Sequence, residues 1–159
     1  MPHAHLAIVR WQRTSDQFLQ GRYSREHTWR FDGGVTVPAS PAPSVVPAPW
    51  SNPAHVDPEE AFVAALSSCH LLTFLWLASK AGVVVDAYED HAEGFLAKNE
   101  RGVPWIARVD LHPRIAFAGA PPDAAALADL HHRAHEQCYI ANSVRSEVRV
   151  LEPRAAEGG

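Results

Sequence analysis

Residues 57–82 read DPEEAFVAALSSCHLLTFLWLASKAG, and this stretch decides the fold. Asp57 can cap a helix, Pro58 suits its first position, and Glu60 completes a capping box with Asp57. Gly82 is typical of the residue just beyond a helix end. Between these signals apolar residues cover nearly every face. We therefore expect one long central helix that is buried on more than one side.

The same stretch is close to the length of a membrane span. Residues 61–79 contain no Asp, Glu, Lys or Arg, and about 18 to 20 apolar residues suffice to cross a bilayer. The residues that precede the run, Asp57, Glu59 and Glu60, are acidic rather than basic, however. The centre of the run is polar, at Ser67, Ser68, Cys69, His70 and Thr73. The sequence therefore favours the buried helix of a soluble protein, and we expect no membrane association.

Strands are expected on both sides of this helix, and a second helix after it. Residues 4–11 and 27–37 read as strands, the latter turning at residues 32–34. Prolines recur from 38 to 58, which indicates a connecting loop. After the helix we expect a strand at 83–88 and a closing strand near 144–150. Between them, residues 92–96 and 105–117 are expected to form a hairpin, and the second of its strands alternates as a half-buried strand does.

A second helix is predicted to begin at residues 121–123, which read Pro-Pro-Asp. Its core stripe has spacings of three and four and consists of Leu127, Leu130, Ala134 and Cys138. The whole layout predicts an α+β fold with helices on one face of a mainly antiparallel sheet. At 159 residues we expect a single domain over 1–159.

Composition excludes several classes of protein. A formal net charge of −4 and the lack of a basic patch argue against nucleic-acid binding. Two cysteines are too few for a secreted disulfide scaffold. The N-terminus, MPHAH, lacks a signal-peptide pattern, so we expect a cytoplasmic protein. In that reducing compartment a cysteine pair is more often catalytic than structural.

The two cysteines, Cys69 and Cys138, are the candidate chemistry. A free cysteine is usually a small buried residue, but the polar neighbours of Cys69 need partners inside an apolar helix. A reactive thiolate also needs a nearby cation, for which arginine is best suited, and a buried arginine needs a carboxylate. The candidates, each equally consistent with a solvated surface charge, are Arg22, Arg25, Arg30, Glu59 and Glu60.

Two motifs give the chain a resemblance to a known family. The first comprises DPEE at 57–60 and AALSSCHLL at 64–72, followed by AGVVV at 81–85, Tyr88 and AEG at 92–94. The second is HEQCYIANSV at 135–144. In this order and spacing the motifs resemble the OsmC/Ohr family, and the resemblance covers most of the chain, from about residue 22 to 150.

The resemblance implies a hydroperoxide reductase with an OsmC-like fold that acts on organic hydroperoxides. It maps the family's peroxidatic cysteine to Cys69 and its resolving cysteine to Cys138. The family's glutamate, ten residues before the first cysteine, maps to Glu59. The family's arginine maps to Arg25 as first choice and to Arg22 as second. It implies no bound cofactor, an external dithiol reductant of lipoyl or other small-thiol type, and an intertwined homodimer.

This chain departs from the family pattern in two places. Tyr139 follows the second cysteine where many relatives have proline, and the proline-rich loop before Asp57 is long. These departures bear on loop geometry and substrate shape. Aromatic residues that are candidates for contact with an organic substrate, or else plain core, are Phe62, Phe74, Trp76 and Trp50.

Helix geometry adds an expectation about assembly. Glu59 and Cys69 are ten residues apart on one predicted helix, which corresponds to about 15 Å along the axis. Glu59 therefore cannot serve the thiol of its own helix. We expect it to act across a homodimer in which two such helices lie antiparallel.

Two alternatives to the peroxidase remain at this stage. One is a metal site built from Cys69-His70 together with His131, His132, His135 and Cys138, although the usual C-x-x-C and H-E-x-x-H patterns are missing. The other is a binding module for a small apolar ligand in which both cysteines are inert.

Overall fold

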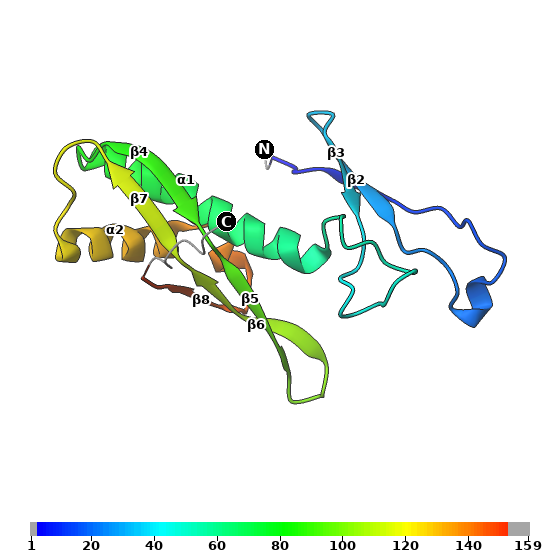
Figure 1. Cartoon of the computed structure of the whole chain (residues 1–159). Coiled ribbons are helices and arrows are strands. Elements are labelled where there is room, and N and C mark those ends of the chain that lie inside the picture. The colour runs from blue at the N-terminus through cyan, green and yellow to red at the C-terminus, as the bar shows by residue number, and fades with distance from the viewer. Residues whose placement is uncertain (1–2, 153–159) are drawn as a thin grey trace. The chain divides into compact units, whose positions relative to one another are not determined.

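The computed structural model of the chain describes residues 3–152. These residues form two compact units that divide between Ala61 and Phe62. Figure 1 labels the helices and most of the strands of the two units. The expectation of one domain over 1–159 stays a prediction.

The first unit is built on a small antiparallel sheet in the order β1-β2-β3. Its strands are β1 (Ala7–Arg10), β2 (His27–Phe31) and β3 (Thr36–Ala39), and a short 3-10 turn, η1 (Phe18–Gln20), lies between β1 and β2. The expected turn within 27–37 is confirmed, since Gly34 adopts φ 90° between β2 and β3. At that φ a residue with a Cβ is strained, so glycine suits this tight hairpin.

The long helix α1 (Pro58–Lys80) begins and ends where the sequence predicts. The Glu60 N–H donates to Asp57 Oδ1 at 2.7 Å, and the Asp57 N–H donates to Glu60 Oε2 at 3.0 Å, which is a complete capping box. Gly82 follows the helix with φ 72°. The local sequence alone therefore sets both ends of this element.

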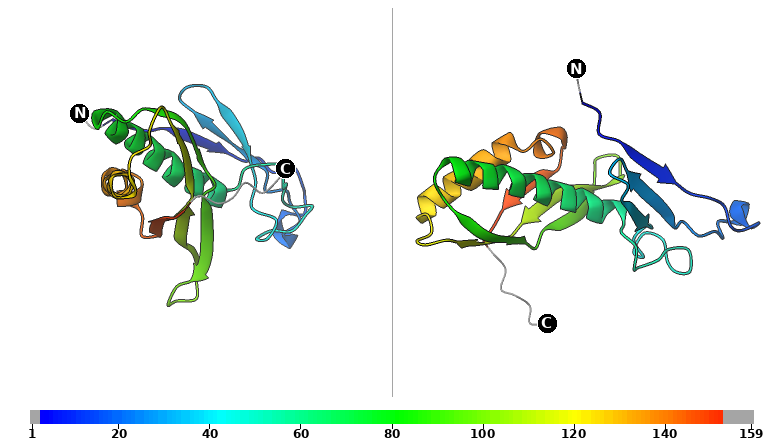
Figure 2. Two further views of the ribbon diagram at one scale, coloured as in Figure 1. Left: turned by 60° about the vertical axis from the view of Figure 1, so that its left-hand side comes forward. Right: turned by 90° about the horizontal axis from the view of Figure 1, so that it is seen from above.

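The second unit contains two further sheets and the second helix. One sheet pairs β4 (Val85–Asp90) with β7 (Pro113–Phe117), and the other has β5 (Glu93–Lys98), β6 (Pro104–Leu111) and β8 (Glu147–Val150) in that order. All of these pairings are antiparallel except β6 with β8. Helices α1 and α2 (Ala124–Gln137) lie on the same side of these strands, as expected (Figure 2).

The prediction of a single half-buried strand at 105–117 is wrong in two respects. The chain makes two strands, because the His112 N–H leaves the ladder to donate to Asp90 Oδ1 at 2.6 Å and Pro113 has no N–H to pair. The end of β6 is also buried on both faces, including Asp110. This carboxylate is tolerated there because Arg149 Nη2 donates to it at 2.8 Å.

Two clusters of buried apolar residues make the core of the second unit. The first joins α1 to α2 and contains Phe74, Leu77, Ala78, Leu130 and Ala134. The second joins α1 to β6 and contains Leu66, Val109 and Leu111. The stripe predicted for the second helix is therefore confirmed as its core face.

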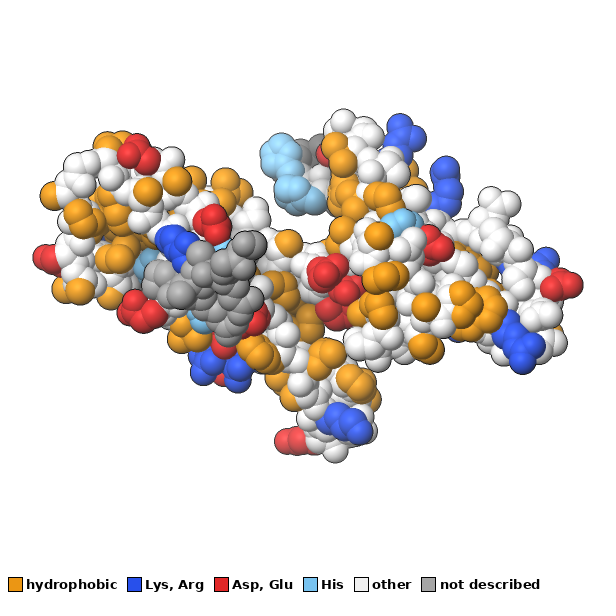
Figure 3. All heavy atoms as spheres, in the orientation of Figure 1, with side chains coloured by type: hydrophobic (Ala, Val, Ile, Leu, Met, Phe, Trp, Pro, Cys, Tyr) orange, Lys and Arg blue, Asp and Glu red, His pale blue; other side chains and the backbone are white. Residues whose placement is uncertain are grey.

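Among residues 3–152, helix α1 is buried along one face only. Its buried residues, Leu66, His70, Phe74, Leu77 and Ala78, all pack within the second unit. Leu72 and Trp76 are 64% and 54% exposed, so the packing described within the second unit does not give the expected burial on several sides. By length and composition α1 would suffice to cross a membrane, but its packed face is that of a core helix. Figure 3 shows hydrophobic side chains scattered among charged ones at the surface.

The close approach of β5 to α1 generates a stability prediction. A Cβ at Gly94 would lie 2.6 Å from Val63 Cγ2, so we expect Gly94→Ala to force a shift of α1 or β5. Such overpacking costs about 1–3 kcal/mol, which lowers Tm by roughly 2–10 °C in a chain of this size. Thermal unfolding followed by circular dichroism measures the shift.

Gly33→Ala is the matched control, because a Cβ there meets no atom within 4 Å. It should leave Tm within about a degree of the wild type. A Gly94→Ala variant as stable as this control would contradict the close packing of β5 on α1.

Candidate active site

The two cysteines come together where α1 meets α2. Cys69 lies on α1 and is partly exposed, and Cys138 caps the C-terminal end of α2 and is 1% exposed. Both are free thiols, and the Cys138 side chain hydrogen-bonds to Cys69. The pairing follows from the helix packing, since Cys138 is the last residue of the stripe that continues from Leu130 and Ala134.

The surroundings of Cys138 keep its sulfur protonated. Burial, together with the hydrogen bond to Cys69, raises the pKa of the Cys138 thiol to about 11. The Ala141 N–H donates to Cys138 Sγ at 3.4 Å and acts in the opposite direction, but it does not offset burial. At neutral pH the Cys138 S–H therefore donates the hydrogen bond to Cys69. Cys69 is the sulfur that solvent reaches.

The Ser67 and Thr73 hydroxyl groups, which interrupt the apolar helix, each have a partner. Ser67 Oγ donates to Asp90 Oδ2 at 2.5 Å, which joins α1 to β4. Thr73 Oγ1 donates to the Cys69 carbonyl at 2.9 Å. These bonds account for hydroxyl groups at the centre of a core helix and hold the turn of helix that carries Cys69.

His70, the residue after Cys69, is buried and pairs with the half-buried His131 of α2. The His70 Nε2 and His131 Nδ1 atoms are 3.0 Å apart, and the two rings stack with centroids 5.4 Å apart. His131 also stacks on Phe74, with centroids 4.5 Å apart. Burial lowers the pKa of both histidines to about 4, so both are neutral at pH 7.

The residues of the metal alternative are not gathered into one site. Among residues 3–152, no three side chains of His, Cys, Asp or Glu are arranged to hold a metal ion. His70 and His131 are hydrogen-bonded to each other. His132 is exposed, and its Nε2 atom lies 3.3 Å from Oε1 of Glu136 on the next turn of α2.

Arg25 and Glu59 line a cavity of about 500 Å³ in the first unit. The Arg25 guanidinium donates to the Tyr23 carbonyl at 2.8 Å and to the Gly21 carbonyl at 3.3 Å, and it lies 3.9 Å from the centre of the Tyr23 ring. Arg22 is exposed and does not line this cavity, so of the two candidates Arg25 faces it. The partners of Arg25 here are backbone and ring, and its pairing with Glu59 stays a prediction.

The sequence also matches a known protein family. Residues 51–152 match the model of the family described as OsmC-like protein. The chain belongs to the OsmC-like family. The expected resemblance is thus confirmed, and the α+β arrangement found above is an OsmC-like fold.

Solved structures of OsmC-like proteins agree with the assignment. An OsmC-like protein of unknown function from Vibrio cholerae is 49% identical, with a TM-score of 0.90, over 94% of this chain and 100% of that one. An organic hydroperoxide resistance protein from Elizabethkingia anophelis is 19% identical, with a TM-score of 0.72, over 98% of this chain and 99% of that one.

A more distant structure shares the fold. The organic hydroperoxide resistance protein OhrB of Bacillus subtilis is also 19% identical, with a TM-score of 0.64, over 95% of this chain and 97% of that one. Among curated proteins no significant match was found.

The aromatic wall beside Arg25 in this OsmC-like chain was not identified from sequence. It consists of Trp11, Phe18 and Tyr23, whose ring centroids are 4.5–5.8 Å apart. Phe74, one of the aromatic residues considered instead, is fully buried in the core. Trp11 ends the strand expected at 4–11, whereas Phe18 and Tyr23 follow it outside any expected helix or strand, so no single periodicity grouped the three.

The His70–His131 pair makes the free energy of unfolding of this OsmC-like protein depend on pH. The pKa of each ring is about 4 when folded and 6.5 as the ordinary value, so the unfolded chain binds more protons between these values. Stability is therefore full above about pH 6.5 and falls as pH drops toward 4. Two full shifts would lose about 5 kcal/mol between pH 7 and 4.5. Because His131 is partly exposed and solvent reduces its share, we expect a loss of about 2–4 kcal/mol, measured by urea unfolding at pH 7, 5.5 and 4.5.

The double variant His70→Leu/His131→Phe removes both titrating rings. It should lose less stability than the wild type between pH 7 and 4.5, while the carboxylates contribute equally in both proteins. An identical pH dependence in the two proteins would contradict the assignment of buried neutral histidines.

Proposed function

We propose that the protein is a thiol-dependent peroxidase that reduces organic hydroperoxides to alcohols. Cys69 is the peroxidatic cysteine and Cys138 the resolving cysteine. The observation that carries this proposal is the hydrogen bond between a partly exposed Cys69 and a buried, protonated Cys138. A resolving thiol must already be near the sulfur that it attacks, and this contact meets that condition.

The reaction balances in two steps. The Cys69 thiolate attacks the terminal oxygen of the hydroperoxide, the O–O bond breaks, and the alkoxide takes a proton and leaves as alcohol. Cys69 is thereby oxidised to a sulfenic acid. The Cys138 sulfur then displaces the hydroxyl group, which leaves as water with the Cys138 proton, and a Cys69–Cys138 disulfide forms.

The disulfide requires an external dithiol for its reduction. Thiol–disulfide exchange passes two electrons from that dithiol to the protein and regenerates both thiols. A lipoyl-type or other small dithiol in the cytoplasm is the proposed donor. No bound cofactor takes part in this cycle.

Charge stabilisation is assigned to Arg25 and Glu59. Arg25 stabilises the thiolate and the departing oxygen, and Glu59 orients Arg25; both line the cavity with the aromatic wall, which suits an organic rather than a polar peroxide. Because Glu59 and Cys69 are about 15 Å apart along α1, these groups come from a second copy of the chain. The exposed Leu72 and Trp76 on α1 support such a homodimer.

The competing function is a binding protein for a small apolar ligand with inert cysteines. Two of the related structures are named organic hydroperoxide resistance proteins, and at 19% identity they establish the fold alone. The distinction between the two functions therefore rests on the reactivity of the cysteines.

Substitution of each cysteine tests the proposed roles. Cys69→Ser should lower consumption of cumene hydroperoxide at least 10³-fold, because the attacking sulfur is lost. Cys138→Ser should complete a single turnover and retain a sulfenic acid on Cys69, detected with a dimedone probe. A Cys69→Ser variant that consumes peroxide at the wild-type rate would reject the peroxidase.

Mixed dimers test whether one site draws on two chains. Cys69→Ser and Arg25→Met homodimers should each be inactive, but unfolding and refolding them together should restore about a quarter of wild-type activity, since half the dimers then carry one intact site. Refolding Cys69→Ser with Glu59→Gln should likewise restore activity. A mixture as inactive as its parents, or a monomeric protein at micromolar concentration, would contradict the shared site.

A further inference from the structure

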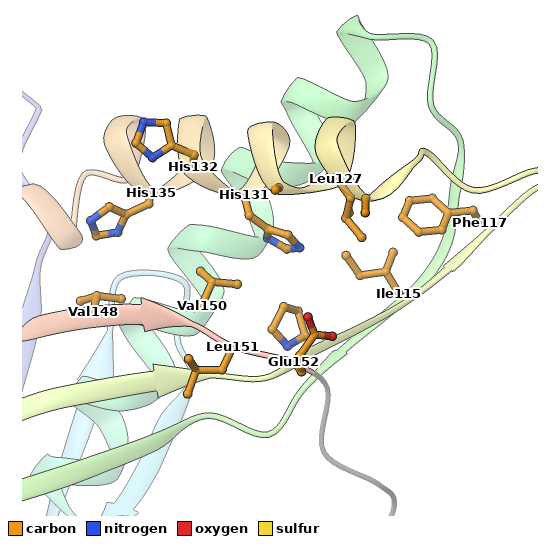
Figure 4. Close-up of a pocket in the computed structure, with 13 residues that line it drawn as sticks. Ile115, Phe117, Leu127, His131, His132, His135, Val148, Val150, Leu151 and Glu152 are labelled. Atoms are coloured by element: carbon orange, nitrogen blue, oxygen red, sulfur yellow. The ribbon is translucent and has the colours of Figure 1, made fainter.

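The second unit contains a cavity that the proposed peroxidase does not use. It has a volume of about 590 Å³ and lies between α2 and the strands β7 and β8 (Figure 4). Neither cysteine lines it. Its size falls within the range of about 300–1,000 Å³ that is typical of small-molecule sites.

Most of the cavity wall is apolar. The strands contribute Ile115, Phe117, Val148 and Val150, and α2 contributes Leu127 and Ala128. An unbranched hydrocarbon chain would lose its contact with water against this wall, and each buried methylene would strengthen binding about fourfold.

Three histidines of α2, His131, His132 and His135, are among the lining residues, and two of them direct their rings into the cavity. The rings of His131 and His135 point from α2 toward the strands (Figure 4). The Nδ1 atom of His135 is buried and, among the described residues, has no hydrogen-bond partner. A buried nitrogen without a hydrogen bond costs free energy, so a ligand with a hydrogen-bonding oxygen near His135 would be stabilised there.

The tautomer of His131 follows from its contact with His70. His70 Nδ1 is buried and has no partner in the described part of the chain, so a proton there would be left unpaired. Because an unpaired buried N–H is rarer than an unpaired acceptor, we assign the His70 proton to Nε2. In this tautomer Nε2 donates to His131 Nδ1, 3.0 Å away. His131 then carries its own proton on Nε2, the ring nitrogen that His70 leaves free, and presents a donor.

The charge of the cavity disfavours an ionised ligand. Burial lowers the pKa of His131 to about 4, so its ring brings no positive charge at pH 7. Glu152 is also part of the wall and would repel a carboxylate. An apolar wall without a paired cation makes a buried anion costly.

We propose that this cavity binds an uncharged, medium-length aliphatic molecule with a carbonyl or hydroxyl oxygen that accepts a hydrogen bond from His131 Nε2. The site is distinct from the cysteine pair and does not depend on the peroxidase being correct.

Isothermal titration calorimetry with 2-octanone and octanoate at pH 7.5 tests this directly. The ketone should bind at one site per chain, and 2-decanone should bind about sixteen-fold more tightly, for two added methylenes. Octanoate should bind at least tenfold more weakly than the ketone. Absence of 2-octanone binding, or octanoate binding as tightly as the ketone, would overturn the proposal.

Variants place the binding in this cavity. Ala128→Trp fills it from an exposed position on α2 and should weaken 2-octanone binding at least tenfold. His131→Phe keeps an aromatic ring against Phe74 but loses the donor, and should weaken binding about tenfold.

His91→Phe is the matched control, since His91 is exposed after β4 and does not line the cavity. It should bind the ketone as the wild type does. Unchanged binding by Ala128→Trp would show that the ketone lies elsewhere and would reject the site, whatever the outcome for the cysteine variants.

Discussion

The packing of α1 against α2 is the contact on which the candidate chemistry depends. Phe74, Leu77 and Ala78 of one helix meet Leu130 and Ala134 of the other, and the same stripe of α2 ends at Cys138. Without this contact the two cysteines, 69 residues apart in sequence, have no reason to meet. The hydrogen bond between their sulfur atoms is a consequence of core packing.

Local signals made much of this predictable. The capping box at Asp57, the glycine after the helix and the stripe of the second helix depend on neighbours in sequence, and each was confirmed. The break of the 105–117 strand was missed because it depends on a side chain from β4, Asp90, that takes the His112 N–H. The His70–His131 pair was missed for the same reason, since it forms only when two helices pack.

The cysteine pair and the neighbouring histidine pair lie among groups that are neutral at pH 7. Burial raises the pKa of the Cys138 thiol and lowers the pKa of His70 and His131, so none of these is charged at pH 7. The cation and the carboxylate of the proposed site, Arg25 and Glu59, both belong to the first unit of the chain. In the proposed homodimer a second copy would supply these two charged groups to the cysteine pair.

Intact-mass spectrometry after addition of one equivalent of cumene hydroperoxide tests the central claim most directly. Under non-reducing conditions the wild-type chain should lose two hydrogen atoms and both titratable thiols, and a dithiol should restore them. The Cys138→Ser chain should instead gain one oxygen atom on Cys69. A wild-type chain of unchanged mass with both thiols still titratable would contradict the assignment of Cys69 and Cys138 as a peroxidatic and resolving pair.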